Sequence, residues 1–192
     1  MPCEKLNPMS LERNIVEHCA PTLAGMKCGC LFHHRSDNPI TQQEIRCINL
    51  KLRNKGVSVT ILRSAENGHL IYVYRKGMVE HCLSYAECLL KDLDYDHVRS
   101  GSAIKHLKSR ISESARLPPE IGIFLGYPLD DIVGFIEHEG RNCKCAGCWK
   151  VYGDEEHAIK LFNRYRMCRM IYKRRYSIGT SMEKLTVRIG TE

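Results

Sequence analysis

The sequence predicts one α/β or α+β domain over residues 1–192, in which about five helices cover a mixed sheet that contains a β-hairpin. Two patterns predict this fold class. Segments with the 3.6-residue apolar spacing of helices alternate with segments rich in β-branched and aromatic residues. The turn Glu66-Asn67-Gly68 separates two such strand segments, 57–62 and 70–74, and gives the strongest hairpin signal in the chain. A chain of this length can bury its own core without disulfides.

The first elements of the chain are predicted to be helices. Ser10 precedes apolar residues at helical spacing, so a helix is expected to begin there and to end near Cys19. Pro21 is favoured at the first position of a helix, which predicts a further short helix over 22–26. These two expectations place Cys19 at a junction between helices.

The next segment, 28–33, is predicted to be a short strand with Cys28 and Cys30 on one face. A helix over 38–54 follows it, because apolar residues recur there at helical spacing and Gly56 is a typical residue for ending a helix. The predicted hairpin comes next.

Four elements are expected between the hairpin and the cysteine-rich segment. Helices over 78–91 and 102–115 have amphipathic spacing, and the two prolines after Leu117 end the second helix. An apolar run over 121–125, bounded by proline and glycine, predicts a buried strand. A helix then begins at Pro128.

The last predicted elements lie beyond a cluster of cysteines. Residues 149–152 are expected to form a strand. Asp154 is a typical N-cap residue, so a long helix is predicted from there to about Tyr176.

The composition predicts a cytoplasmic protein. No apolar run is long enough to span a membrane, and the first residues lack the apolar region of a signal peptide. The chain has eleven cysteines, an odd number, and a reducing compartment argues against a disulfide framework. Free buried thiols, a metal site or reactive thiols remain as interpretations. The net charge of +7 favours an anionic ligand or an acidic partner.

The candidate functional site is the cluster of Cys143, Cys145 and Cys148. In extended backbone the first two sulfurs point to the same side, and Gly147 permits a turn that brings the third sulfur to them. Three converging thiolates predict a zinc, iron or iron–sulfur centre. A redox-active group of thiols and a tight turn without chemistry are the alternative interpretations.

A complete metal centre needs a fourth ligand from another part of the chain. Cys19 is the first candidate, because the positive end of a helix that begins at Pro21 would lower the pKa of its thiol. His18 beside it is a candidate ligand or general base. Cys168, on the inward stripe of the final helix, is the alternative fourth ligand.

Charged residues near the cysteines have functional and structural interpretations. Lys144 and Lys150 are candidates for binding an anionic cofactor and for stabilising thiolates. Asp130 and Asp131 form a pair suited to acid–base chemistry, although acids in the first turn of a helix also favour the helix dipole. The basic stripe of the final helix would suit phosphate groups, but no nucleic-acid motif accompanies it, which favours a solvated face.

Three segments resemble the signatures of an uncharacterised family of anaerobic Gram-positive bacteria that is known only as a domain of unknown function. They are HCAPTLAG at 18–25, PEIGIFLGYPLDD at 119–131 and NCKCAGCWKVYGD at 142–154. The resemblance spans nearly the whole chain and implies no established activity. It implies a genomic setting of flavodoxins and ferrous-iron uptake, which favours redox or iron chemistry over nucleic-acid binding. Cys28 and Cys30 lie outside these signatures.

Three hypotheses for function follow. The first is a cysteine-rich protein that binds iron–sulfur, iron or zinc, or carries out thiol or iron redox chemistry, through Cys143, Cys145 and Cys148 with Cys19. The second is a thiol-dependent enzyme in which Cys19 is the nucleophile or redox thiol. The third is a basic adaptor that binds nucleic acid or an acidic redox protein such as flavodoxin.

Overall fold

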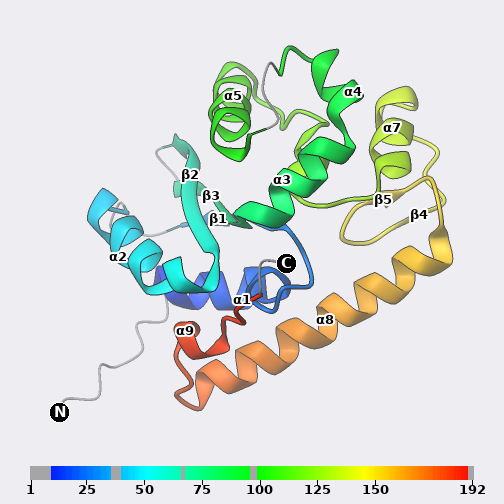
Figure 1. Cartoon of the computed structure of the whole chain (residues 1–192). Coiled ribbons are helices and arrows are strands. Elements are labelled where there is room, and N and C mark those ends of the chain that lie inside the picture. Colours follow the sequence, from blue (N-terminus) through cyan, green and yellow to red (C-terminus); the bar gives the residue numbers. More distant parts are fainter. Residues whose placement is uncertain (1–9, 36–39, 66–67, 96–98, 190–192) are drawn as a thin grey trace.

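A three-stranded antiparallel sheet forms the centre of the molecule (Figure 1). The computed structural model describes residues 10–35, 40–65, 68–95 and 99–189. The strands are β1 (Gly29–His34), β2 (Val57–Ala65) and β3 (Gly68–Arg75), in the order β1-β3-β2. The α+β class and the β2–β3 hairpin are therefore confirmed. The described residues contain nine α-helices, six of which have seven residues or more.

The central strand β3 is covered on both faces. Ile71 and Val73 belong to the core on one face, whereas Leu70 and Tyr72 belong to the core on the other. Successive side chains of a strand point to opposite faces, so a covered central strand needs apolar residues at every position. This is why the segment has an unbroken apolar run.

Helices α1 (Leu11–Leu23) and α2 (Gln42–Leu52) cover one face of the sheet. Thr41 and Glu44 form a capping box at the start of α2, which supplies hydrogen-bond partners to the first backbone amides of the helix. A short 3-10 helix, Arg53–Lys55, follows α2. Gly56 then ends the segment with a φ of 70°, as its position predicted.

The first predicted helix end was wrong, because α1 continues through Pro21 to Leu23. Proline removes only one backbone donor and lies here in the last turn, so little of the helix is lost. The buried guanidinium of Arg75 donates to the carbonyls of Thr22 and Leu23 at 2.6 Å each, which supplies partners at the end of α1. Cys19 therefore lies inside a helix and is not at the start of one.

Helices α3 (Lys76–Tyr85), α4 (Glu87–Lys91), α5 (Ser100–Glu113) and α6 (Ile121–Phe124) pack on the other face. The single helix predicted over 78–91 is interrupted at Ala86. The strand predicted over 121–125 is wrong, since these residues form α6 and bury Phe124. A short apolar run does not distinguish a buried strand from a buried helical turn.

The remaining elements extend from this core. They are α7 (Leu129–Glu137), a small hairpin of β4 (Cys145–Ala146) and β5 (Lys150–Val151), α8 (Glu155–Ser177) and α9 (Met182–Leu185). The N-cap predicted at Asp154 is confirmed, because its carboxylate accepts a hydrogen bond from the His157 amide at 3.0 Å.

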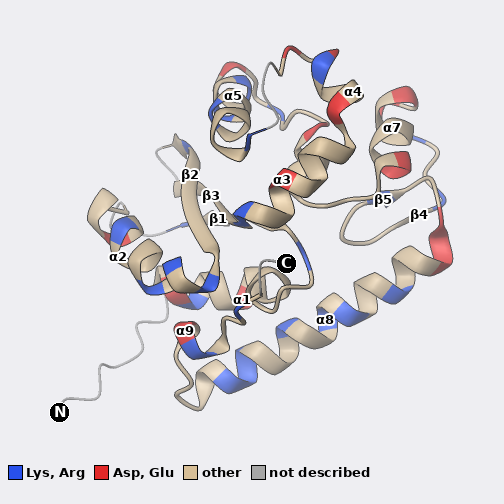
Figure 2. Cartoon of the chain, viewed as in Figure 1, with Lys and Arg blue, Asp and Glu red and all other residues tan. Residues whose placement is uncertain are grey.

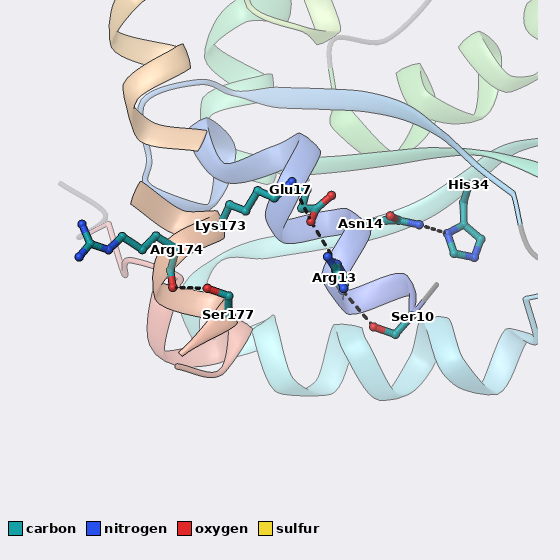
Figure 3. A network of polar contacts seen from close by, with 8 residues as sticks. All are labelled: Ser10, Arg13, Asn14, Glu17, His34, Lys173, Arg174 and Ser177. Atoms are coloured by element: carbon teal, nitrogen blue, oxygen red, sulfur yellow. Dashed lines mark hydrogen bonds and ion pairs between the residues drawn. The ribbon is translucent and has the colours of Figure 1, made fainter. Parts of the chain in front are cut away.

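Helix α8 packs along α1, and polar contacts join the two helices (Figure 3). Glu17 of α1 accepts a hydrogen bond from Arg13 at 3.1 Å and forms an ion pair with Lys173 of α8 at 3.5 Å. Asn14 of α1 in turn hydrogen-bonds His34 of β1 at 2.8 Å. Helix α1 is thus held between the sheet and α8.

Helix α8 is rich in arginine and lysine along its length (Figure 2). Neither α8 nor any other helix of the described ranges is both long and apolar enough to cross a membrane.

Candidate functional site

The three cysteines of the predicted metal site lie on or beside the small hairpin, and they do not share one centre. Cys145 lies near Cys143 and hydrogen-bonds the Glu155 carboxylate. Cys148 lines a separate cavity, where Nη2 of Arg169 donates to its sulfur at 4.0 Å. Among the described residues, no three His, Cys, Asp or Glu side chains are placed so that they could hold a metal ion. The predicted ligands therefore do not fit a metal centre as they lie, and the metal stays a prediction.

Among the described residues, no interaction links either candidate for a fourth ligand to the hairpin cysteines. Cys19 is fully buried in α1 and contacts Cys30. Burial raises the pKa of the Cys19 thiol, so the helix-end effect predicted to lower it is absent. Cys168 is buried on the inner side of α8, and this burial raises the pKa of its thiol to about 11.

The two lysines predicted to bind a cofactor hold the backbone around the hairpin instead. Nζ of Lys144 donates to the Gly153 carbonyl, and Nζ of Lys150 donates to the Gly140 carbonyl, each at 2.6 Å. Burial raises the pKa of Cys145, and the nearby Glu155 adds to that effect. The basic setting predicted for these thiols is therefore not found at Cys145.

Asp131 fixes the hairpin to α7. Its buried carboxylate accepts hydrogen bonds from Nε1 of Trp149 at 2.6 Å and from the amides of Tyr152 and Gly153 at 2.7 Å each. Its neighbour Asp130 is exposed. The expected pair of carboxylates is therefore split, and the role of Asp131 here is to position the cysteine-rich segment.

Close approach of backbone to side chains explains two glycines of this region. A Cβ on Gly134 would lie 2.5 Å from the Cβ of Tyr152, and a Cβ on Gly147 would lie 2.4 Å from the ring of Phe162. Such contacts are too short for any other residue without a shift of the neighbour. The hairpin can thus lie directly on α7 and on the start of α8.

A cavity of about 460 Å³ lies between α1, β1, the hairpin and α8. Its polar lining comes from His18, Lys27, Cys30, Asn163, Cys148, Arg166 and Arg169, and the aromatic side chains on its wall are Tyr127, Phe162 and Tyr165. The volume falls within the range of about 300–1,000 Å³ that is typical of sites for small molecules. We take this cavity as the candidate functional site.

The Cys30 sulfur is the most activated group of the cavity. The neighbouring Cys19 thiol stabilises its thiolate most, and Lys27 and Arg169 act on it with positive charge. The Thr22 hydroxyl is buried and has no hydrogen-bond partner in the part of the chain that the structure describes. These effects outweigh burial and lower the pKa of Cys30 to about 6.

Lys27 is a buried cation, with only 9% of the residue exposed. Its ammonium lies 4.9 Å from the ring centre of Tyr127 and 6.0 Å from that of Tyr165. No carboxylate is paired with it within residues 10–35, 40–65, 68–95 and 99–189. Buried charges are normally paired, so this ammonium is suited to a thiolate or to an anionic ligand.

Cys28 and Cys30 were predicted to share a face of one strand, and this was wrong. Cys30 belongs to the core on the α1 side, whereas Cys28 belongs to the core on the α3 side. Cys28 precedes β1 and donates to the Phe124 carbonyl at 3.3 Å. Cys82 of α3 lies beside it, and the interaction of the two thiols raises the pKa of Cys28 and lowers that of Cys82.

All three segments that carry the family resemblance contribute to the cavity. Residues 18–25 supply His18, residues 119–131 supply Tyr127, and residues 142–154 supply Cys148. His18, predicted as a ligand or base, is exposed at the cavity and stacks on the ring of Phe32, with ring centres 5.2 Å apart.

Sequence reasoning missed Lys27, considered Cys30 only as half of a same-face pair on a strand, and considered Arg169 only as part of the basic stripe of the final helix. Cys30 and Arg169 are far apart in the chain, and the packing of α8 against α1 brings them together. A lysine two residues after Gly25, in a cysteine-rich turn, was the one available signal.

A family model described as "Protein of unknown function (DUF3793)" matches residues 15–186. Comparisons with curated proteins and with solved structures find no significant match.

Proposed function

We propose that this chain, which belongs to the DUF3793 family of proteins of unknown function, binds a small anionic ligand in the cavity and uses Cys30 as a reactive thiolate. The observation that carries this proposal is the position of Cys30 in the cavity wall, beside the buried Lys27, which has no carboxylate partner among the described residues. A thiolate is the nucleophilic form of cysteine, and positive neighbours favour it.

The charge of the cavity supports an anionic ligand. Lys27, Arg166 and Arg169 line it, and no aspartate or glutamate does so among the described residues. Ion pairs strengthen when water is excluded, so a carboxylate or phosphate would be bound more tightly here than on an open surface. Tyr127 and Phe162 offer apolar contact for the rest of the ligand.

The reactive thiol of this proposal is Cys30 and not Cys19, which the sequence favoured. Cys19 has no exposed surface and donates its proton toward Cys30, so burial keeps it in the neutral form. Cys30 is 7% exposed and lines the cavity. The thiol-dependent enzyme predicted from the sequence is retained with this change of residue.

The rate at which iodoacetamide alkylates Cys30 is expected to rise with pH around a midpoint near pH 6. The midpoint for an ordinary thiol is about 8.5. Because the pKa is lowered, the thiolate persists at neutral pH and is lost only as the pH falls through the midpoint of Cys30. Peptide mass spectrometry of protein alkylated at a series of pH values measures the rate at Cys30 alone.

Lys27→Gln is expected to raise this midpoint and to slow alkylation at pH 7, since it removes a positive charge beside the sulfur. Lys105→Gln is the matched control, because Lys105 is exposed and lies on α5 across the sheet. This substitution is expected to change neither the midpoint nor the rate of alkylation. A midpoint near that of an ordinary thiol in the unsubstituted protein would contradict the proposal.

An acidic protein partner, such as the flavodoxin that the family resemblance suggests, is a second candidate function. Helix α8 favours it, because Arg174 and Arg175 are exposed there beside Met170 and Ile171, which are 59% and 52% exposed. Binding to a flavodoxin that weakens steeply with salt would support this candidate. Binding that is independent of salt would oppose it.

The metal centre predicted at Cys143, Cys145 and Cys148 remains a separate proposal. Metal analysis after anaerobic purification tests it, and a bound metal that Cys145→Ser removes would support it.

A further inference from the structure

We infer that Cys30 and Cys19 form a dithiol couple that reduces the disulfide of a small anionic thiol compound bound in the cavity. This inference rests on the proposed function for the reactive Cys30, and it adds the substrate class and the second thiol.

Burial determines the order of the two thiols. Cys30 of β1 lines the cavity, whereas Cys19 of α1 lies behind it with no exposed surface. Both thiols lie in the apolar core on the α1 side of the sheet, and the Cys19 thiol acts directly on the Cys30 sulfur. A ligand in the cavity can therefore reach the Cys30 sulfur, and Cys19 is the thiol that acts most strongly on Cys30 from the protein side.

The chemistry balances with a disulfide as the only co-reactant. The Cys30 thiolate attacks one sulfur of the bound disulfide, which forms a mixed disulfide and releases one thiolate. Cys19 then loses its proton to solvent or to the released thiolate and attacks the Cys30 sulfur. This step releases the second thiolate and leaves a Cys19–Cys30 disulfide. The protein loses two electrons, and the substrate gains them as two thiols.

The charge of the cavity selects the substrate. Lys27, Arg166 and Arg169 would pair with carboxylates that flank the disulfide, and a cationic disulfide would be repelled. Focused positive charge in a cleft raises the rate of association of an anion by about tenfold or more.

A second pair of neighbouring cysteines, only one of which is buried, lies away from the cavity. Cys28 and Cys82 also act on each other, on the α3 side of the sheet. Neither lines the cationic cavity. This pair is therefore the internal control for the effect of the cavity.

The experiment treats the reduced full-length protein separately with three disulfides: anionic glutathione disulfide, neutral bis(2-hydroxyethyl) disulfide and cationic cystamine. Mass spectrometry of peptides follows each cysteine with time. We expect a Cys19–Cys30 disulfide to form, about tenfold or more faster with glutathione disulfide than with cystamine. Equal rates, or a faster reaction with cystamine, would overturn the substrate class.

Variants separate the couple from the reactive thiol. Cys19→Ser and Cys19→Ala are both expected to stop at a mixed disulfide on Cys30, and circular dichroism shows which of the two is folded. Cys82→Ser is expected to form the Cys19–Cys30 disulfide at the rate of the unsubstituted protein. If that unsubstituted protein itself stops at a mixed disulfide on Cys30, the couple is overturned and the reactive Cys30 stands. If Cys30 does not react with any of the disulfides, the proposed function fails as well.

Discussion

Asp131→Ala is expected to destabilise the protein by about 3 kcal/mol and to release the hairpin from α7, because three donors, one of them the buried indole of Trp149, lose a charged acceptor. The hairpin carries Gly147 and Cys148, which form part of the cavity wall. The substitution is therefore expected to lower the stability of the protein. It is also expected to remove the preference of Cys30 for anionic over cationic disulfides.

Urea unfolding followed by fluorescence measures this effect, since Trp149 is the only tryptophan of the chain and donates directly to Asp131. Asp130→Ala is the matched control. Its carboxylate is exposed in the same helical turn, so a change within about 0.5 kcal/mol is expected. Equal effects of the two substitutions would contradict the anchoring role of Asp131.

Arg75→Met is expected to have the largest effect on stability, about 4 kcal/mol, because four backbone carbonyls lose their donor, two of them in buried contacts. The guanidinium donates to Thr22, Leu23, Lys55 and Val187. These contacts join the end of α1, the segment before β2 and the C-terminal segment to the sheet. Burial lowers the pKa of Arg75, which shows that the charge is held at a cost in solvation.

Arg75→Lys is expected to recover little of this loss, since an ammonium lacks the planar fork that reaches several acceptors. Arg63→Ala provides the control on the same sheet. Arg63 donates to only one carbonyl, that of Ser114 at 3.2 Å, so a loss below about 1 kcal/mol is expected. Chemical unfolding followed by circular dichroism measures all three variants. A loss for Arg75→Met no greater than for Arg63→Ala would refute this role.

Elements with short-range signals could be predicted from the sequence. The β2–β3 hairpin follows from a turn between two apolar runs, and the start of α8 follows from Asp154. Segments whose structure depends on tertiary contacts could not be predicted. Helix α1 passes through Pro21 because Arg75, distant in sequence, supplies donors to its last turn. The apolar run of α6 has no period that distinguishes a helix from a strand.

The candidate site was only partly predictable for the same reason. The sequence pointed to Cys148, His18 and Cys19, and all three lie at or directly behind the cavity. It gave no indication that Cys19 would pair with Cys30 or that α8 would bring Arg169 to them. Those contacts are set by the packing of α1 between β1 and α8, which has no local signature.

Comparison of iodoacetate with iodoacetamide at Cys30 tests the cationic, reactive cavity most directly, because the two reagents have nearly the same size and differ in charge. We predict that iodoacetate reacts with Cys30 at least as fast as iodoacetamide does. Arg169→Gln is expected to lower the ratio of the iodoacetate rate to the iodoacetamide rate by about tenfold. The exposed Cys47 and Cys88 of the same protein provide the reference ratio. The same ratio at Cys30 as at these two cysteines would contradict an anion-binding site around a reactive Cys30.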